Sequence, residues 1–326
     1  MSRYLADRLL QSFIVLVVMS FVIFWLMGLM PGDPIDLMIS ADPKLTPDDA
    51  IRLRELHGLD RPISERYVNW LGSAINGDLG FSRLHAKPVL TILWPALGNT
   101  VLLLGISFIV SVLFALPAGI YAAIKQYSAP DYLINLAAFA GISIPSFWLA
   151  LLLITLFSVI LGVLPASGTE NIGGLTGFWD TAKFLVLPIA TLTIASIGSH
   201  TRFVRAAVIE TMRQDYIRTA RAKGASEVRV ILHHVLRNAL IPVVTIIALD
   251  FGYLFSGALI VETIFAYPGM GKLIFDAIMG NDFNLAMIAF LFATILTLLG
   301  NLLADIAYGW LDPRISYGES NESSGA

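Results

Sequence analysis

The feature that most constrains this chain is a set of long stretches without any Asp, Glu, Lys or Arg. About 20 apolar helical residues cross the hydrocarbon core of a bilayer. The uninterrupted stretches are 9–32, 88–124, 132–169, 184–201 and 283–304. A sixth apolar stretch, 238–261, is interrupted only by Asp250. The chain is therefore expected to be an all-α polytopic membrane protein with six transmembrane helices.

Composition supports a membrane protein and excludes several other classes. Hydrophobic residues make up 56% and charged residues 14% of the 326 residues, against roughly 45–50% and about 25% in soluble domains. The net charge of −3 provides no basic field for nucleic acid. The absence of cysteine excludes disulfides and thiolate metal sites. Since the short alternation of barrel strands is missing, helices must satisfy the backbone in lipid.

The distribution of Lys and Arg predicts the orientation in the membrane. With the N-terminus inside, twelve of these residues lie in cytoplasmic segments and two in the short outside loops, so both termini are expected in the cytoplasm. The first apolar stretch is too long for a signal peptide and is expected to remain as a span. The expected segments are a cytoplasmic N-terminus (1–8), spans at 9–30, 96–124, 132–162, 184–206, 238–262 and 283–306, extracytoplasmic segments at 31–95 and 263–282, a cytoplasmic loop at 207–237 and a cytoplasmic tail at 307–326.

The first extracytoplasmic segment carries mixed charge, with nine acids and seven bases between Asp33 and Lys87. Thr46 followed by Pro47 is a typical helix start, and a second short helix is expected from about Pro62 to Asn76. Two interpretations remain open at this point. The segment is either a solvated cap over the helices or a docking surface for an external partner.

The cytoplasmic stretch 202–237 has the most unusual layout in the chain. Eight of its residues are basic and three are acidic. Helix-forming residues run to Lys223, Gly224 breaks the helix, and Ala225 and Ser226 are placed to begin another. This pattern predicts a helix, glycine turn and helix that protrude as a knob. The knob is either a protein docking element or a basic loop resting on anionic headgroups.

Signatures of catalysis and metal binding are missing from the sequence. The nearest approach to an ATP-binding P-loop, at 269–273, has Ala266 in place of the first glycine and Leu273 in place of the hydroxyl. His233 and His234 are adjacent, so a helix points them apart and no shared metal is expected. No Gly-x-Ser-x-Gly elbow occurs. We expect no catalytic residues, no metal and no cofactor bound by this chain itself.

Asp250 lies near the middle of the expected fifth span, where an acid marks a functional site by default. Its carboxylate is expected to contact a cationic substrate, to carry a proton, or to be satisfied by a partner helix or water. Ser256 joins it as a candidate for the substrate path. At the outer end of the same span, Glu262 is a candidate outer gate or docking residue, together with Pro268 and Gly269 in the following loop.

Four motifs, in order along nearly the whole chain, resemble the permease subunits of ATP-binding-cassette importers of the dipeptide, oligopeptide and nickel family, specifically the first of their two permease types. The motifs are Pro31 to Pro34; Gly58 to Pro62 with Tyr67, Trp70 to Gly72 and Gly77 to Gly80; Asp215 to Ala225 with Arg237 to Pro242; and Val261 to Phe265 with Tyr267 to Gly271.

The resemblance implies that the cytoplasmic stretch is the coupling element of such importers, called the EAA loop. Aligning the loop's glycine with Gly224 leaves only the final alanine of Glu-Ala-Ala, at Ala220, and the later proline is absent at Arg237. The variant of the peptide permeases, Arg-Thr-Ala-Arg-Ala-Lys-Gly, matches without a gap. The coupling residues implied are Tyr216, Arg218, Thr219, Ala220, Arg221, Ala222, Lys223, Gly224, Ala225 and Ser226.

The resemblance also implies the type I ABC importer permease fold and a set of partners in the bacterial inner membrane. These are a second homologous permease subunit, two ATP-binding subunits that hold ATP and magnesium, an extracytoplasmic substrate-binding protein and the lipid bilayer, with no nucleic acid. Closure of the ATPase dimer would move the knob and tilt the fourth and fifth spans. Peptides are the default cargo of this family.

Other functions are kept as alternatives. Within the family, the cargo is alternatively a nickel chelate, an opine or an oligosaccharide. A secondary transporter or channel would need no ATPase, but its frequent sign, repeated halves with broken helices, is not evident in this sequence. A regulatory or assembly protein would use the knob for binding without transport.

Overall fold

The computed structural model describes residues 2–29, 47–56, 60–169, 177–241, 243 and 258–311. These residues are almost entirely helical, with one two-stranded hairpin. The elements are α1 (Ser2–Gly28), α3 (Pro47–Leu56), α4 (Ile63–Ile75), β1 (Phe81–Ser82), β2 (Lys87–Pro88), α5 (Val89–Ile124), α6 (Ala129–Ser143), α7 (Ser146–Leu153), the π-helix η1 (Ile154–Ile160), α8 (Phe178–Met212), α9 (Asp215–Ala222), α10 (Glu227–Arg229), the π-helix η2 (Val230–Val235), α12 (Met270–Met279) and α13 (Phe283–Leu311).

Among the described residues, four helices are long and apolar enough to cross a membrane, and a bent pair of helices would make a fifth span. The four helical stretches are Ala6–Gly28, Val89–Ile124, Trp179–Met212 and Phe283–Leu302. Most of the expected fifth span, 238–262, lies outside the described residues. The structure thus describes four or five of the six expected spans, and α5 and α8 begin several residues before the boundaries expected for their spans.

The stretch expected as a single third span, 132–162, is divided in the structure. α6 and the combined helix Ser146–Ile160 meet at a bend of 102°. Pro145 lies at the break, and Ile144 before it has an extended backbone (φ −82°, ψ 121°). A residue before proline is pushed out of the helical region, so the sequence itself explains where α6 ends.

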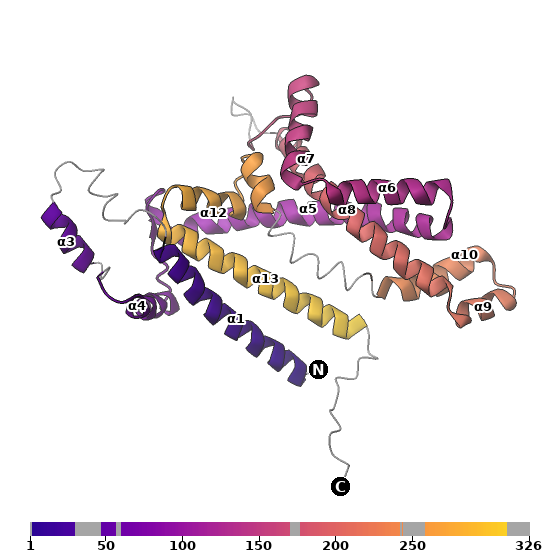
Figure 1. Ribbon diagram of the computed structural model, residues 1–326, viewed down its shortest axis with the longest axis horizontal. Helices are drawn as coiled ribbons and strands as arrows, with labels where there is room; N and C mark the ends of the chain where they lie inside the picture. The colour runs from indigo at the N-terminus through magenta and orange to yellow at the C-terminus, as the bar shows by residue number, and fades with distance from the viewer. Residues whose placement is uncertain are drawn as a thin grey trace, which may run out of the picture.

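Close helix pairs form the centre of the molecule, where α5 and α6 both pack against α8 and also contact each other (Figure 1). Glycines permit these approaches. A Cβ atom on Gly198 of α8 would lie 2.3 Å from the carbonyl oxygen of Ala138, and one on Gly119 of α5 would lie 2.7 Å from that of Thr201. Small residues at such crossings are a common way to bring membrane helices together, because packing replaces the hydrophobic effect in lipid.

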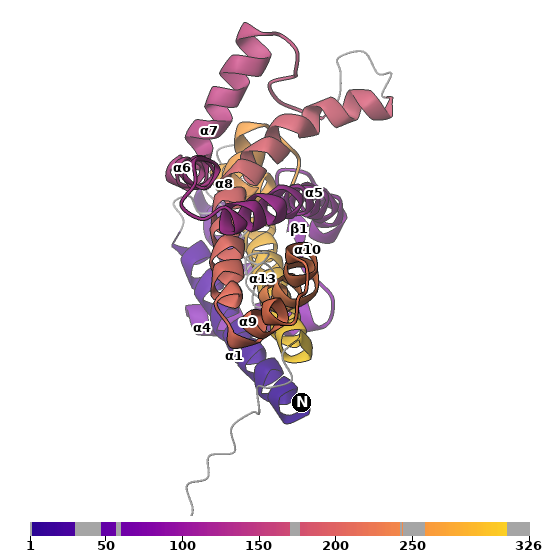
Figure 2. The same ribbon diagram turned by 90° about the vertical axis from the view of Figure 1, so that its right-hand side faces the viewer.

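A second layer contains α1, α12 and α13, which are linked to the centre through contacts of α12 and α13 with α5. The start of α1, the end of α13 and the α9–α10 region turn toward the right-hand side of Figure 1, whereas α3, α4 and α12 lie toward the left. Figure 2, viewed from that right-hand side, shows α9 and α10 in front and α7 projecting away from α6.

Asp282 ties the β1–β2 hairpin to the start of α13. Its carboxylate accepts hydrogen bonds from the Ser82 hydroxyl (2.6 Å) and the Leu84 amide (3.0 Å). It also accepts one from the Leu285 amide (3.2 Å), which makes Asp282 the N-cap of α13. The β1–β2 hairpin, in the segment expected to be extracytoplasmic, is therefore fixed to the start of α13.

Candidate functional site: the knob and the outer node

The knob, residues 213–235, is built by a break at each end of α9. α8 ends at Met212, and Gln214 has an extended backbone (ψ 148°) before α9 begins. After α9, Ser226 is again extended (ψ 148°) and precedes α10, which continues as η2. The helix, glycine turn and helix expected from the sequence are present at these positions.

Gly224 ends α9 because it has a left-handed backbone, with φ of +81°. Its amide donates to the Arg221 carbonyl (2.9 Å), and the Ala225 amide donates to the Ala220 carbonyl (3.2 Å). These two bonds form a Schellman cap, which satisfies carbonyls that a helix end otherwise leaves open. No neighbouring atom lies within 4 Å of a Cβ placed on Gly224, so glycine is favoured here by backbone conformation alone.

Buried aliphatic side chains attach the knob to α5 and α8. Ile217 of α9 and Val230 of η2 are fully buried in a cluster with Val204 and Val208 of α8 and Ala123 of α5. Because protein interiors are closely packed and resist deformation, a force on the knob reaches α5 and α8 directly.

The expected coupling residues divide between this buried side and the surface. Ala220 and Ala225 are half-buried and pack against the cluster around Ile217. The remaining expected residues are exposed, namely Tyr216, Arg218, Thr219, Arg221, Ala222, Lys223, Gly224 and Ser226. Sequence reasoning did not single out Val228 and Leu232, which are large apolar side chains exposed on the second arm of the knob.

An ion pair connects the two arms of the knob. The Arg221 guanidinium donates from Nε to Glu227 Oε1 (2.8 Å) and from Nη2 to Glu227 Oε2 (3.1 Å). This two-pronged geometry fixes the relative direction of the groups better than a single contact. A longer contact joins Arg218 to Asp215 within α9 (3.4 Å). Sequence reasoning placed Arg221 in the knob but did not identify Glu227 as its partner.

A second ion pair, beside the knob, joins α6 to α8. Arg205 donates from Nε and Nη2 to the two carboxylate oxygens of Asp131 (2.6 and 2.8 Å). Asp131 is only 2% exposed, and it also accepts bonds from the Tyr127 amide (2.9 Å) and the Asn135 amide group (2.7 Å). In the sequence, Arg205 is one of the eight basic residues of the stretch 202–237. The pairing could be found only by knowing that α6 packs against α8.

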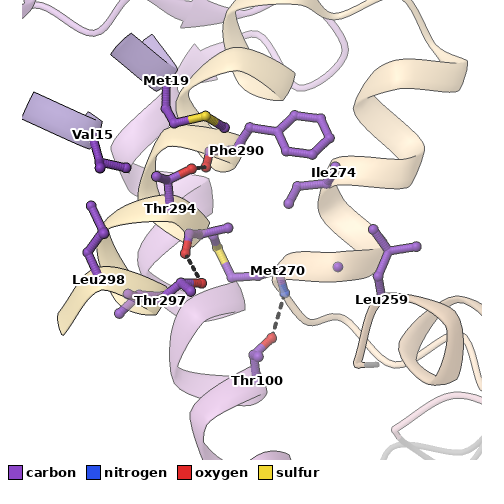
Figure 3. Close-up of a pocket in the computed structure, with 13 residues that line it drawn as sticks. Val15, Met19, Thr100, Leu259, Met270, Ile274, Phe290, Thr294, Thr297 and Leu298 are labelled. Carbon is purple, nitrogen blue, oxygen red and sulfur yellow. Dashed lines mark hydrogen bonds between the residues drawn. The ribbon is translucent and has the colours of Figure 1, made fainter. Parts of the chain in front are cut away.

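At the opposite side of the molecule, fully buried Glu262 organises the outer node, residues 262–272 together with Asn99 and Thr100. Glu262 accepts hydrogen bonds from the Thr100 hydroxyl (2.6 Å) and the amides of Gly271 (2.7 Å) and Lys272 (3.2 Å). Its carboxylate therefore lies at the N-terminus of α12, where backbone amides are open and the helix dipole favours negative charge. Thr100 in turn accepts from the Met270 amide (2.7 Å; Figure 3).

The glycines of the outer node leave room for this carboxylate. A Cβ on Gly269 would lie 2.3 Å from the Glu262 carboxyl group, and one on Gly271 would lie 2.3 Å from the Leu259 backbone. Pro268 is exposed, and its carbonyl accepts from the Asn99 side chain (2.9 Å). Of the three expected outer residues, Pro268 alone reaches the surface.

Tyr267 completes the outer node. Its hydroxyl donates to the Asn99 carbonyl (3.1 Å). Burial, and secondly the nearby Glu262 carboxylate, raises the pKa of Tyr267 to about 12, since both disfavour a second negative charge. The phenol stays protonated at physiological pH and keeps its role as a donor.

A cavity of about 510 Å³ lies beside the outer node, between α1, α5, α12 and α13 (Figure 3). Its lining is apolar except for threonines, and the hydroxyls of Thr294 and Thr297 donate to carbonyls of their own helix. The two residues expected on the substrate path, Asp250 and Ser256, lie outside the described residues. Over the described residues, no group of three His, Asp or Glu side chains could hold a metal ion.

Comparison with known proteins places this arrangement in a family. Residues 115–317 match the family described as "Binding-protein-dependent transport system inner membrane component", and residues 1–88 match its N-terminal counterpart. The oligopeptide transport system permease protein AppB of Bacillus subtilis is 39% identical over 318 residues, covering 97% of this chain and 100% of AppB. The glutathione transport system permease protein GsiC of Escherichia coli K12 is 36% identical over 317 residues, with 97% and 100% covered.

The fold has counterparts among solved structures. An inward-facing structure of the MetNI methionine ABC transporter superposes with a TM-score of 0.58 at 18% identity, covering 69% of this chain and 98% of that one. At this identity the likeness concerns the fold, which is that of a type I importer permease. The expected family and the expected multi-pass location in the inner membrane are confirmed. The chain belongs to the family of inner-membrane permease components of binding-protein-dependent transport systems.

Proposed function

We propose that this chain forms half of the translocation path of an ATP-driven peptide importer and couples that path to ATPase subunits through the knob. The observation that carries the coupling proposal is the construction of the knob. Ile217 and Val230 anchor it to α5 and α8, while most of the expected coupling residues remain exposed to a partner. In this proposal ATP and magnesium bind to two partner ATPases, and a second permease completes the path.

Coupling proceeds by rigid movement of the knob. When the ATPase dimer closes, each permease knob moves with the subunit on which it is seated. Because the buried cluster around Ile217 joins the knob to α5 and α8, these helices tilt with it. The Asp131–Arg205 pair extends the same rigid unit to α6. Rigid-body motion of packed elements is a common way to switch access.

The relatives support a peptide cargo. Similar permeases are named for the transport of oligopeptides in Bacillus subtilis, dipeptides in Alkalihalophilus pseudofirmus and glutathione in Escherichia coli, and each similarity covers 97% of this chain. We propose Asp250 and Ser256 as residues of the substrate path. An extracytoplasmic binding protein delivers the peptide at the outer face, where the exposed Pro268 and the buried Glu262 and Gly269 form one outer element beside α12.

We further propose six spans with both termini in the cytoplasm. The excess of Lys and Arg in the segments assigned to the inside supports this orientation. In Figure 1 the start of α1, the end of α13 and the knob face the same side, as this orientation requires.

The assembly is tested by purification from gently solubilised native membranes, followed by mass spectrometry and ATPase assay. We expect two ATPase chains, a second permease and a binding protein, whose ligand is then screened with peptides, nickel chelates, opines and oligosaccharides. Purification of the chain alone, without ATPase activity, would contradict the proposal.

The coupling role of the knob is tested by substitutions that leave the membrane helices unchanged. Gly224→Pro forces φ from +81° to about −65° and removes an amide donor. Arg221→Glu places two carboxylates where the Arg221–Glu227 pair now lies. We expect both to abolish peptide uptake while insertion is retained.

The matched control is the charge swap, Arg221→Glu combined with Glu227→Arg. It re-forms the link between the two arms of the knob, so we expect it to recover most of the uptake lost in Arg221→Glu. Normal uptake by both Gly224→Pro and Arg221→Glu would refute the coupling role.

A further inference from the structure

α4 lies beside α1 at the level of the membrane span. The Tyr67 hydroxyl is hydrogen-bonded to the Ser20 hydroxyl (2.7 Å), and the Tyr67 ring packs edge-on against Phe21 and Phe24 (centroids 5.2 and 5.6 Å apart). Trp70 packs against Phe24 (5.8 Å). α4 is thus held against residues that lie within α1.

These contacts set the depth of α4 relative to the bilayer. Ser20, Phe21 and Phe24 belong to the apolar stretch Ala6–Gly28. Ser20 precedes Gly28 by eight residues, which corresponds to roughly 12 Å along the helix. Figure 1 shows α4 nearly end-on beside α1, which runs across the same view, so the two helices cross. A helix in this place lies across the outer part of the span and does not stand above it.

α4 is amphipathic, and its contact with α1 accounts for only some of its apolar residues. Tyr67 and Trp70 face α1. Val68 and Ile75, seven residues apart and therefore on one edge of the helix, are 63% and 78% exposed. Glu65 and Asn69 are also exposed and belong to the polar side of the helix.

We propose that α4 is an interfacial helix and that its Val68–Ile75 edge contacts the lipid of the outer leaflet. The surroundings of this edge indicate that lipid covers it. The exposed edge belongs to a helix that crosses α1, where Phe21 and Trp25 are themselves large exposed apolar side chains within the span. Helices with one apolar and one polar side and with aromatic anchors lie in the headgroup region with the apolar side in the acyl boundary. Tyr67 and Trp70 are aromatic residues typical of that boundary.

This inference changes the role of part of the first extracytoplasmic segment. Residues 63–75 are an anchor in the membrane surface, in place of a solvated cap or a docking surface for a soluble partner. The anchor braces the outer half of α1 from the side, independently of how the knob is coupled.

The test uses the absence of cysteine in the chain, which makes each introduced thiol unique. Val68→Cys and Ile75→Cys report on the apolar edge, and Glu65→Cys and Asn69→Cys are matched controls on the polar side of the same helix. Each variant is expressed with the complete transporter, and intact spheroplasts are treated with a membrane-impermeant polyethylene-glycol maleimide that shifts the band of this chain. We expect the apolar-edge thiols to react at least about tenfold more slowly, since apolar surroundings suppress the reactive thiolate.

A second measurement identifies what covers the slow positions. Benzophenone maleimide, which permeates membranes, is attached at Val68→Cys or Ile75→Cys and photoactivated in liposomes of phosphatidylethanolamine and phosphatidylglycerol. Adducts with phospholipid and no cross-linked protein band would support the proposal. Two results would overturn it, namely equally fast maleimide reaction at all four positions, and a cross-link to the second permease or the binding protein.

Discussion

At the scale of single residues, the buried Glu262 carboxylate explains why glycines occupy positions 269 and 271. Its two oxygens accept three hydrogen bonds, from the Thr100 hydroxyl and the amides of Gly271 and Lys272. The glycines at 269 and 271 are needed because a Cβ at either position would collide with the carboxylate or with the backbone of Leu259. In the structure Glu262 joins α12, α5 and the helix at 258–264, and its role as an outer gate or docking residue stays a prediction.

Glu262 is expected to matter first for stability. Glu262→Ala leaves the Thr100 hydroxyl and two amides without an acceptor, and each buried unsatisfied group costs about 1–3 kcal/mol, so we expect a loss of roughly 3 kcal/mol or more. Glu262→Gln keeps one carbonyl oxygen and should lose much less. Thermal unfolding of the solubilised transporter, followed by size-exclusion chromatography, measures both. If the alanine variant were as stable as the parent, the three hydrogen bonds to Glu262 would not contribute to stability.

At the scale of elements, the molecule depends on close crossings between helices. α8 touches α5 through Gly119 and α6 through Gly198, with hypothetical Cβ contacts below 3 Å in both cases. The Asp131–Arg205 pair lies on the α6–α8 contact, nearer the knob. Packing and a paired charge therefore hold α6, α5 and α8 together, whereas α7 turns away from α6 at the Pro145 bend and still packs against α8.

This packing predicts opposite effects for two glycine substitutions in membrane helices. Gly198→Ala places a methyl group 2.3 Å from the Ala138 carbonyl oxygen, and overpacking of this kind typically costs about 1–3 kcal/mol. Gly105→Ala in α5 meets no atom within 4 Å and should be neutral or stabilising, since alanine is the better helix former. We expect a lower apparent melting temperature for Gly198→Ala than for Gly105→Ala, measured in the same detergent. Equal melting temperatures would mean that α6 and α8 can move apart without a loss of stability.

At the scale of the whole molecule, the knob and α12 of the outer node lie toward opposite ends of α5 and α8 (Figure 1). The three buried clusters follow this axis, one around α12 and α13, one at the middle of α5 and one at the knob. In the proposed coupling, a movement imposed at the knob is transmitted along these two long helices toward the outer node.

The proposed orientation predicts which positions are reachable from outside the cell. Lys87→Cys, in the exposed β2 strand, should react with an impermeant maleimide in intact spheroplasts. Ser2→Cys should react only in inverted vesicles, and a green fluorescent protein fused after Ala326 should fluoresce because it remains in the cytoplasm. Labelling of Ser2→Cys from outside would require an odd number of spans or the reverse orientation.

Several elements could be predicted because their signals are local. The charge-free stretches predicted the helices α1, α5, α8 and α13, and the helix expected from about Pro62 to Asn76 is observed at Ile63–Ile75. Gly224 was expected to break the helix before it, and its left-handed backbone does so. The family was also predictable, since the motifs that carry it are short and occur in a fixed order. In each case neighbouring residues alone determine the outcome.

Other features depended on which helices meet. The Pro145 signal was present in the sequence, but the 102° bend was not expected, because a proline within a long apolar stretch does not determine how sharply the chain turns. The partners of Glu262, Arg205 and Arg221 are separated from them by between 6 and 162 residues. Even for the shortest of these separations, the turn at Gly224 has to be in place before Arg221 can reach Glu227.

The sequence by itself determined that this chain is a helical membrane permease with a knob whose turn requires glycine, because hydrophobic length, charge asymmetry and backbone conformation are properties of short segments. Only the tertiary structure decided that buried Glu262 accepts hydrogen bonds from α5 and α12, that Asp131 and Arg205 join α6 to α8, and that α4 lies against the span of α1. The reason is physical. Hydrogen bonds, ion pairs and close packing act over a few ångströms, and in this molecule those short distances join residues that are far apart in the chain.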